Sequence, residues 1–202
     1  FFNAELETSP IEMDALVVSK GYFSHAEDQP TSTVNFSAEE IRRSPVALGD
    51  VSRIVYGLPS VAKVNDTFSS LYVRGGSPTE NSFFVDNIEM PSISHYPIQG
   101  TSGGFLGLLN VDMVQDVNFY TGGFSAAYGD KLSSIMDLSL REGNRDEVDI
   151  QLDMHFAGVG GVAEGPLGGG KGSWLFSARE SFVELLFKIL GEEGNVPAYN
   201  DY

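Results

Sequence analysis

The chain has 202 residues, enough for one good hydrophobic core, or for one domain and part of another. Its 28 acidic residues outnumber its 12 basic ones, and the formal charge of -16 argues against nucleic acid or an anionic lipid surface as a partner. The absence of cysteine excludes disulfides and thiolate metal sites, and no apolar run reaches the length of a membrane-spanning helix.

Residues 1–30 show no helical period and are predicted to be extended. The first residues lack the basic and apolar regions of a signal peptide, so we expect that a leader was removed or that the sequence begins inside a longer protein. One β-branched run, Ala15-Leu-Val-Val-Ser19, has acidic residues before it and Lys20-Gly21 after it. This run is either a linker or a peptide that adds as a strand to a sheet edge.

Two short helices are predicted next. Ser37 is followed three residues later by Glu40, which is a capping-box pattern, and Pro45 must end that helix. The second helix is expected over 48–58, with Gly57 and Pro59 at its end. Its apolar face consists of Leu48, Val51, Ile54, Val55 and Leu58.

From Phe68 onward the sequence predicts short strands separated by turn residues such as Asp86-Asn87. Strands are expected at 71–74, 82–85, 117–120 and 134–140. Helices followed by short strands favour a small α+β domain. The glycine-rich stretch 100–107 is predicted to be a loop.

After Gly143 apolar and polar residues alternate strictly over 148–156, so one face of this strand is apolar and the other polar. A strand of a soluble two-sheet protein and a strand of a membrane barrel both give this alternation. A second β run is expected at 174–178. The chain stops at Tyr202 without an obvious end, which we interpret as truncation.

Motifs for nucleotide binding and catalysis are incomplete. The stretch 165–172 has the spacing of a phosphate-binding loop, but Gly172 replaces the required hydroxyl residue and a strand follows, so a hairpin loop is predicted. The stretch 158–163 matches a dinucleotide fingerprint, but Gly165-Pro166 stands where the helix should run. His25, His95 and His155 lack metal-ligand spacing. We predict no catalytic residues, no cofactor and no metal, and hence no enzyme.

Three phrases in one order give the strongest signal: Leu71-Tyr-Val-Arg-Gly-Gly-Ser-Pro, Phe84-Val-Asp-Asn-Ile-Glu-Met-Pro and Tyr120-Thr-Gly-Gly-Phe-Ser-Ala-Ala-Tyr-Gly. Together they resemble the plug domain of TonB-dependent outer-membrane receptors. The resemblance covers about 12–143 well and 144–202 loosely. Two departures are Asn87 and Ser133-Ser134, where the family commonly has glycine.

The resemblance implies an α+β fold, in which a small plug with a short mixed β-sheet and two or three short helices precedes an incomplete set of barrel β-strands. Residues 1–30 would be an extended N-terminal segment, 31–143 the plug, and 144–202 the first strands and a loop of a barrel of about 22 strands. Two or three strands cannot close a barrel. We therefore expect these strands to be disordered, packed on the plug or joined to another molecule.

The resemblance also implies a function, the import of a bulky nutrient such as a siderophore, vitamin or glycan across the outer membrane, with the plug gating and coupling energy. The peptide 13–20 resembles the TonB box, and the residues expected to bind the TonB C-terminal domain are Asp14, Ala15, Leu16, Val17 and Val18. Arg74 is expected to pair with carboxylates of the barrel wall. The residues expected in ligand-facing loops are His95, Tyr96, Gln99 and Tyr128.

The other implied partners are the protein's own β-barrel and an unidentified nutrient ligand, with or without a surface lipoprotein. The full-length protein is expected in the outer membrane, while the acidic chain itself is expected to be soluble. The alternative is a soluble β-rich adhesion or protein-interaction module whose strands echo the same phrases. A parent reading frame that continues with many alternating strands would favour the receptor.

Overall fold

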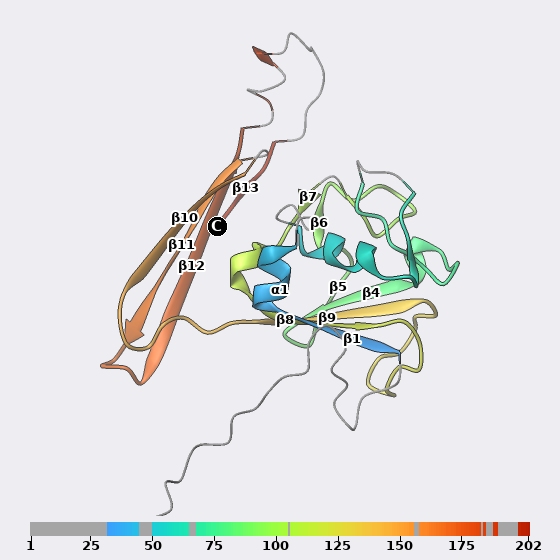
Figure 1. Ribbon diagram of the computed structural model, residues 1–202, viewed down its shortest axis with the longest axis horizontal. Helices are drawn as coiled ribbons and strands as arrows, with labels where there is room; N and C mark the ends of the chain where they lie inside the picture. Colours follow the sequence, from blue (N-terminus) through green and yellow to red (C-terminus); the bar gives the residue numbers. More distant parts are fainter. Residues whose placement is uncertain are drawn as a thin grey trace, which may run out of the picture.

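The computed structural model describes residues 32–44, 50–64, 68–104, 106–155, 158–182, 184, 188–189 and 198–202. It consists of a mixed module over 32–140, which we call the first module, and a long antiparallel sheet beside it, which we call the second sheet (Figure 1). The peptide expected to bind TonB, at 14–18, lies outside the described residues.

The first module is built on a five-stranded mixed sheet in the order β1-β8-β9-β4-β5. Its strands are β1 (Thr33–Ser37), β4 (Asn81–Val85), β5 (Ile88–Met90), β8 (Val114–Tyr120) and β9 (Ser134–Leu140). Strands β4 and β9 pair in parallel, and the other neighbours pair antiparallel. This mixed sheet confirms the predicted fold class.

One face of this sheet carries the hydrophobic core. Alternate residues of the central strands point to that face, and the helical segments α1 (Ala38–Arg43) and η1 (Val51–Gly57) cover it (Figure 1). The fully buried side chains include Phe83, Phe119, Met136, Leu138, Ile41, Val51 and Val55. The sheet and both helical segments therefore share one core.

Helix α1 begins at the predicted capping box. The Ser37 hydroxyl accepts a hydrogen bond from the Glu40 amide at 3.4 Å, and the Glu40 carboxylate accepts one from the Ser37 amide at 2.9 Å. The second predicted helix forms as the 3₁₀ helix η1, and it is shorter than expected. Its end is tight because the Leu58 amide bonds to the Val55 carbonyl at 3.0 Å, and Pro59 cannot donate the bond that would continue it.

Two small antiparallel pairs complete the first module. Strands β2 (Val61–Ala62) and β3 (Tyr72–Val73) form one pair, and β6 (Ser94–His95) and β7 (Leu106–Gly107) form the other. Strand β3 is shorter than predicted because Arg74 adopts φ 50° and turns the chain. Two further 3₁₀ turns are η2 (Pro78–Glu80) and η3 (Val111–Met113).

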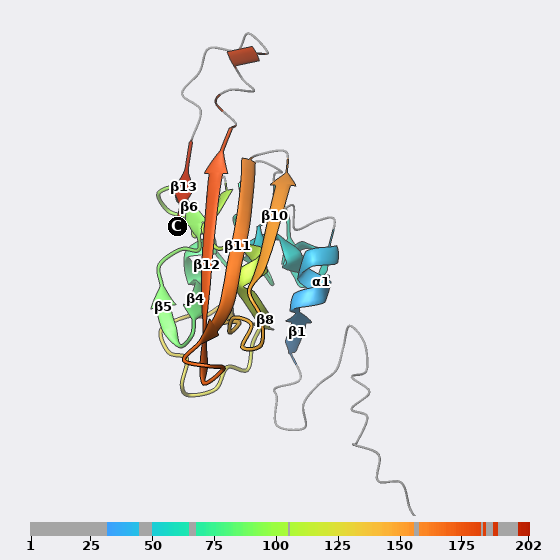
Figure 2. The same ribbon diagram turned by 90° about the vertical axis from the view of Figure 1, so that its left-hand side faces the viewer.

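The second sheet pairs its strands in chain order, all antiparallel (Figure 2). Its strands are β10 (Asp149–His155), β11 (Gly158–Leu167), β12 (Gly172–Ser181) and β13 (Asn200–Asp201). The turn between β11 and β12 consists of residues 168–171, and its three glycines, 168–170, have positive φ. This confirms a hairpin loop rather than a phosphate-binding loop. The sheet is open and packs beside the first module (Figure 1).

The two faces of the second sheet differ in polarity, as the alternation predicts. On the outer face Ile150, Leu152 and Met154 are 66%, 83% and 78% exposed. On the inner face Ser177 and Arg179 of β12 are buried against the first module. Among the described residues there is no helix with the length and apolar character needed to cross a membrane.

Candidate functional site

Two polar clusters join the second sheet to the first module, and the first of them centres on Arg141, directly after β9. The Arg141 guanidinium donates to Glu164 of β11 at 2.5 Å and to the carbonyl of Asp112 at 2.5 Å. The same Glu164 carboxylate accepts the Asn144 amide at 2.9 Å. Arg42 of α1 lies 2.8 Å from the Asp112 carboxylate. The Arg141 cluster therefore connects α1, η3 and the end of β9 to β11.

The second cluster centres on Arg179 of β12, a residue that is only 6% exposed. Its Nη2 donates to the carbonyls of Gly107 at 3.1 Å and Leu108 at 2.7 Å, and its Nη1 donates to that of Leu109 at 3.3 Å. Nη2 also bonds to the Asp201 carboxylate at 2.5 Å. A guanidinium presents several donors in a rigid plane, so one side chain holds three successive carbonyls of the first module.

His95 and Tyr96, two of the residues predicted to face a ligand, lie beside the Arg179 cluster. His95 Nε2 is 2.7 Å from Asp201 Oδ1, although the two atoms do not have the geometry of a hydrogen bond. The His95 ring also stacks on Tyr199, with ring centroids 5.0 Å apart. The Tyr96 hydroxyl donates to the Ala198 carbonyl. The structure thus brings these two residues together against the segment that contains β13.

The other two predicted ligand-facing residues are placed differently. Gln99 is exposed in the loop between β6 and β7. Tyr128 donates to the Asp137 carboxylate at 2.8 Å and packs against Phe84 and Tyr120. Burial, with the Asp137 hydrogen bond and charge, raises the pKa of Tyr128. The loop that carries Tyr128 follows β8 and lies at the end of the first module away from β6 and β7 (Figure 1).

Arg74, predicted to contact the barrel wall, is exposed and forms no ion pair with the described part of the chain. Its guanidinium lies over Gly122, where an added Cβ would stand 3.0 Å from Nη1. The pairing of Arg74 with wall carboxylates stays a prediction.

Asp50 is a buried carboxylate that sequence reasoning did not select. It caps η1 by accepting the Ser52 amide at 2.9 Å, and it lies 3.3 Å from the Arg53 guanidinium. Burial raises the pKa of Asp50 despite these hydrogen bonds. A Cβ at Gly107 would stand 2.8 Å from Asp50 Oδ1, so η1 packs directly on the β7 residue whose carbonyl Arg179 binds.

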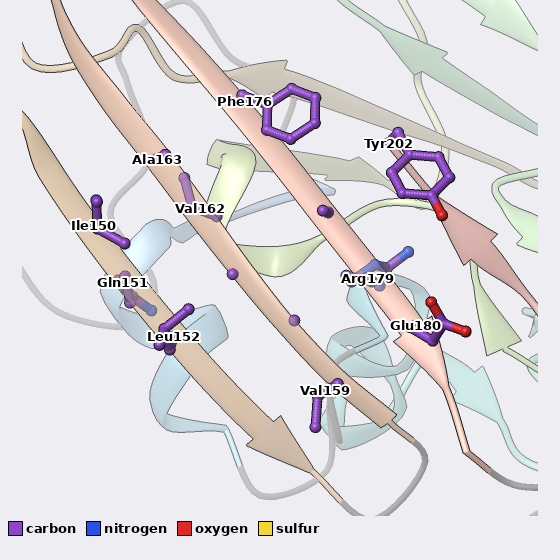
Figure 3. A pocket seen from close by; sticks show the side chains of 13 residues that line it. Ile150, Gln151, Leu152, Val159, Val162, Ala163, Phe176, Arg179, Glu180 and Tyr202 are labelled. Atoms are coloured by element: carbon purple, nitrogen blue, oxygen red, sulfur yellow. The ribbon is translucent and has the colours of Figure 1, made fainter.

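Two hollows flank strand β12. The first, of about 630 Å³, lies between residues 108–113 of the first module and the inner face of β12 and β13. Beside it, the side-chain Nδ2 of Asn110 donates to the Ser177 hydroxyl at 2.8 Å. The second hollow, of about 370 Å³, is on the outer face, where Gly161 and Ala163 leave room between larger side chains (Figure 3). These larger side chains include Ile150, Leu152, Val159 and Phe176.

A family model described as "TonB-dependent Receptor Plug Domain" matches residues 25–134, more than half of the chain. The alcaligin outer membrane receptor FauA from Bordetella pertussis is similar in structure, with 15% identity and a TM-score of 0.51 over 77% of this chain and 27% of FauA. The outer membrane transporter YddB from Escherichia coli matches with 12% identity and a TM-score of 0.45 over 74% of this chain and 24% of YddB. At 15% identity the likeness to FauA shows the fold alone. No curated protein matches.

Proposed function

Because this chain belongs to the family of TonB-dependent receptor plug domains, we propose that it is the gating and energy-coupling part of a receptor that imports a bulky nutrient across an outer membrane. The chain spans 27% of the length of FauA, so the transport activity of the whole protein is part of this proposal. In it, residues 31–143 are the plug, 144–202 begin the barrel, and 1–30 are the extended coupling segment.

The observation that carries this proposal is the relation of the second sheet to the first module. The polar inner face of the sheet meets the first module through Arg179 and Glu164, and the apolar face points away from it. A strand of a membrane barrel needs this division, because lipid faces one side and the plugged lumen the other. We take the first module as the plug and the second sheet as the start of the barrel wall.

In the proposed mechanism a ligand binds at the end of the plug formed by β6, β7 and their loop, where His95, Tyr96 and Gln99 lie. This end is opposite the start of β1, where the N-terminal segment joins the plug (Figure 1). Ligand binding increases the fraction of receptors in which residues 14–18 are released into the periplasm. The TonB C-terminal domain then pairs with this peptide as an added strand and pulls on the plug. A ligand bound at this end would not reach Tyr128, which lies at the other end of the plug, so a contact with Tyr128 would require a second binding position.

The absence of cysteine from the chain permits a direct test by site-specific crosslinking. In a full-length receptor made in cells, Val17→Cys is paired with a cysteine in the strand-pairing region of TonB, and Phe2→Cys is the matched control. We expect a disulfide-linked complex for Val17→Cys and little for Phe2→Cys, because strand addition holds residues 14–18 beside TonB. Equal crosslinking at both positions, or at neither, would contradict the proposed coupling.

The soluble adhesion or interaction module is not supported by the family match, and no contact in the described residues favours it.

A further inference from the structure

Arg179 reaches across the junction between the wall and the plug to a distant part of the sequence. Its three carbonyl partners lie 70 to 72 residues away along the chain, in the segment that runs from β6 through β7 to η3. The guanidinium is buried, and these carbonyls with Asp201 supply its hydrogen bonds. A buried cation with this many partners fixes the backbone that supplies them.

We propose that Arg179 is a positioning residue, which holds plug residues 93–110 against the barrel wall and so sets the geometry of the ligand-facing end. This inference rests on the proposed function for the meaning of that end, but the contact itself is independent of it. His95 and Tyr96 belong to the held segment, and both also touch residues 198–201. Strand β12 and residues 198–201 therefore contact the plug segment at two places, residues 107–109 and residues 95–96.

The Arg141 cluster has a different part in this arrangement. Glu164 follows Arg141 by 23 residues, after the linker, β10 and the first part of β11, and the Asn144 amide binds the same carboxylate. These two hydrogen bonds to one carboxylate hold β11 beside the end of β9. The Arg179 contacts join parts of the chain that are 70 to 72 residues apart.

A hollow lies directly beside the Arg179 contacts. The hollow of about 630 Å³ borders Arg179, Asn110 and Ser177, so carbonyls freed by separation become hydrated instead of remaining buried without partners. The opposite side of the segment is more rigid, because Gly107 packs on the buried Asp50 carboxylate.

Amide hydrogen exchange of the 202-residue chain tests this inference. The reporter is the Leu108 amide, which donates to the Ile93 carbonyl at 2.7 Å and belongs to the peptide group whose carbonyl, that of Gly107, Arg179 binds. Arg179→Met removes the donors with little change in volume, and Arg145→Met is the matched control, since Arg145 is exposed and pairs with Glu142. We expect exchange at Leu108 to accelerate about tenfold or more in Arg179→Met and to stay unchanged in Arg145→Met.

The central strands β8 and β9 serve as the internal reference, and we expect their amides to keep wild-type protection. Arg179→Lys retains the charge without the planar fork, and we expect it to fall between the wild type and Arg179→Met. The inference would be overturned if Arg179→Met showed wild-type exchange at Leu108 while β8 and β9 stayed protected. It would also be overturned if both Arg179→Met and Arg179→Lys lost protection in β8 and β9, because Arg179 would then act on global stability. Neither result bears on TonB crosslinking.

Discussion

At the scale of single residues, Arg179 and Arg74 differ in their contacts because of where each lies in the fold. Arg74 stands in a recognisable phrase, so sequence reasoning selected it as a wall contact, but it is exposed and unpaired among the described residues. Arg179 directly follows the β run predicted at 174–178, and nothing in the local sequence indicates its partners. Its role depends on which backbone packs against it, and no local pattern carries that information.

Gly107 offers a test of the packing between β7 and η1. Its missing side chain lets the backbone approach Asp50, and an added Cβ would stand 2.8 Å from Oδ1 and 3.3 Å from the Asp50 Cα. Because Asp50 is buried and held by Ser52 and Arg53, it cannot move aside freely. We expect Gly107→Ala to lower the free energy of unfolding by about 1–3 kcal/mol in urea denaturation.

The matched control is Gly129→Ala, because a Cβ there meets nothing within 4 Å. We expect its unfolding free energy to stay within about 0.5 kcal/mol of the wild type. Equal effects of the two substitutions would mean that Asp50 does not restrict β7.

At the scale of elements, local signals located the short helices and several strands. The capping box at Ser37 and Glu40 placed α1, and the predicted strand 134–140 coincides with β9. Strand β11 was not predicted, because its glycines and Pro166 obscure both alternation and β propensity. Neighbours on both sides stabilise it, since β10 and β12 pair along its length. Pairing of this kind is a property of the assembled sheet.

The turn between β4 and β5 tests whether backbone conformation selects its residues. Asp86 and Asn87 have φ of 48° and 66°, which suits asparagine and glycine and disfavours β-branched residues. We expect Asn87→Gly to change the unfolding free energy by less than about 0.5 kcal/mol, and Asn87→Val to lower it by about 1–2 kcal/mol. Urea denaturation of both variants measures this difference. A neutral Asn87→Val would show that β5 does not depend on this turn.

At the scale of the whole molecule, the sequence predicted two unlike parts, and packing of the second on the first was one of three arrangements expected from it. Alternation over 148–156 gave the apolar and polar faces of β10, and the resemblance supplied the plug. The contacts that join them, Arg141 to Glu164 and Arg179 to residues 107–109, link positions far apart in sequence. Such pairings follow from tertiary packing, which is why His95 and Tyr96 proved to be neighbours of β13 while Tyr128 did not.

The central claim is that the chain couples to TonB through strand addition at residues 14–18. Calorimetric titration of the chain with a periplasmic TonB C-terminal domain measures this most directly. The wild type is compared with a variant carrying Val17→Pro and Val18→Pro, and with a control carrying Ser24→Pro and His25→Pro. Proline removes the backbone donor that a strand ladder needs. The account predicts that the wild type and the control bind the TonB domain and that the variant carrying Val17→Pro and Val18→Pro does not. Undiminished binding by the variant carrying Val17→Pro and Val18→Pro would contradict the account.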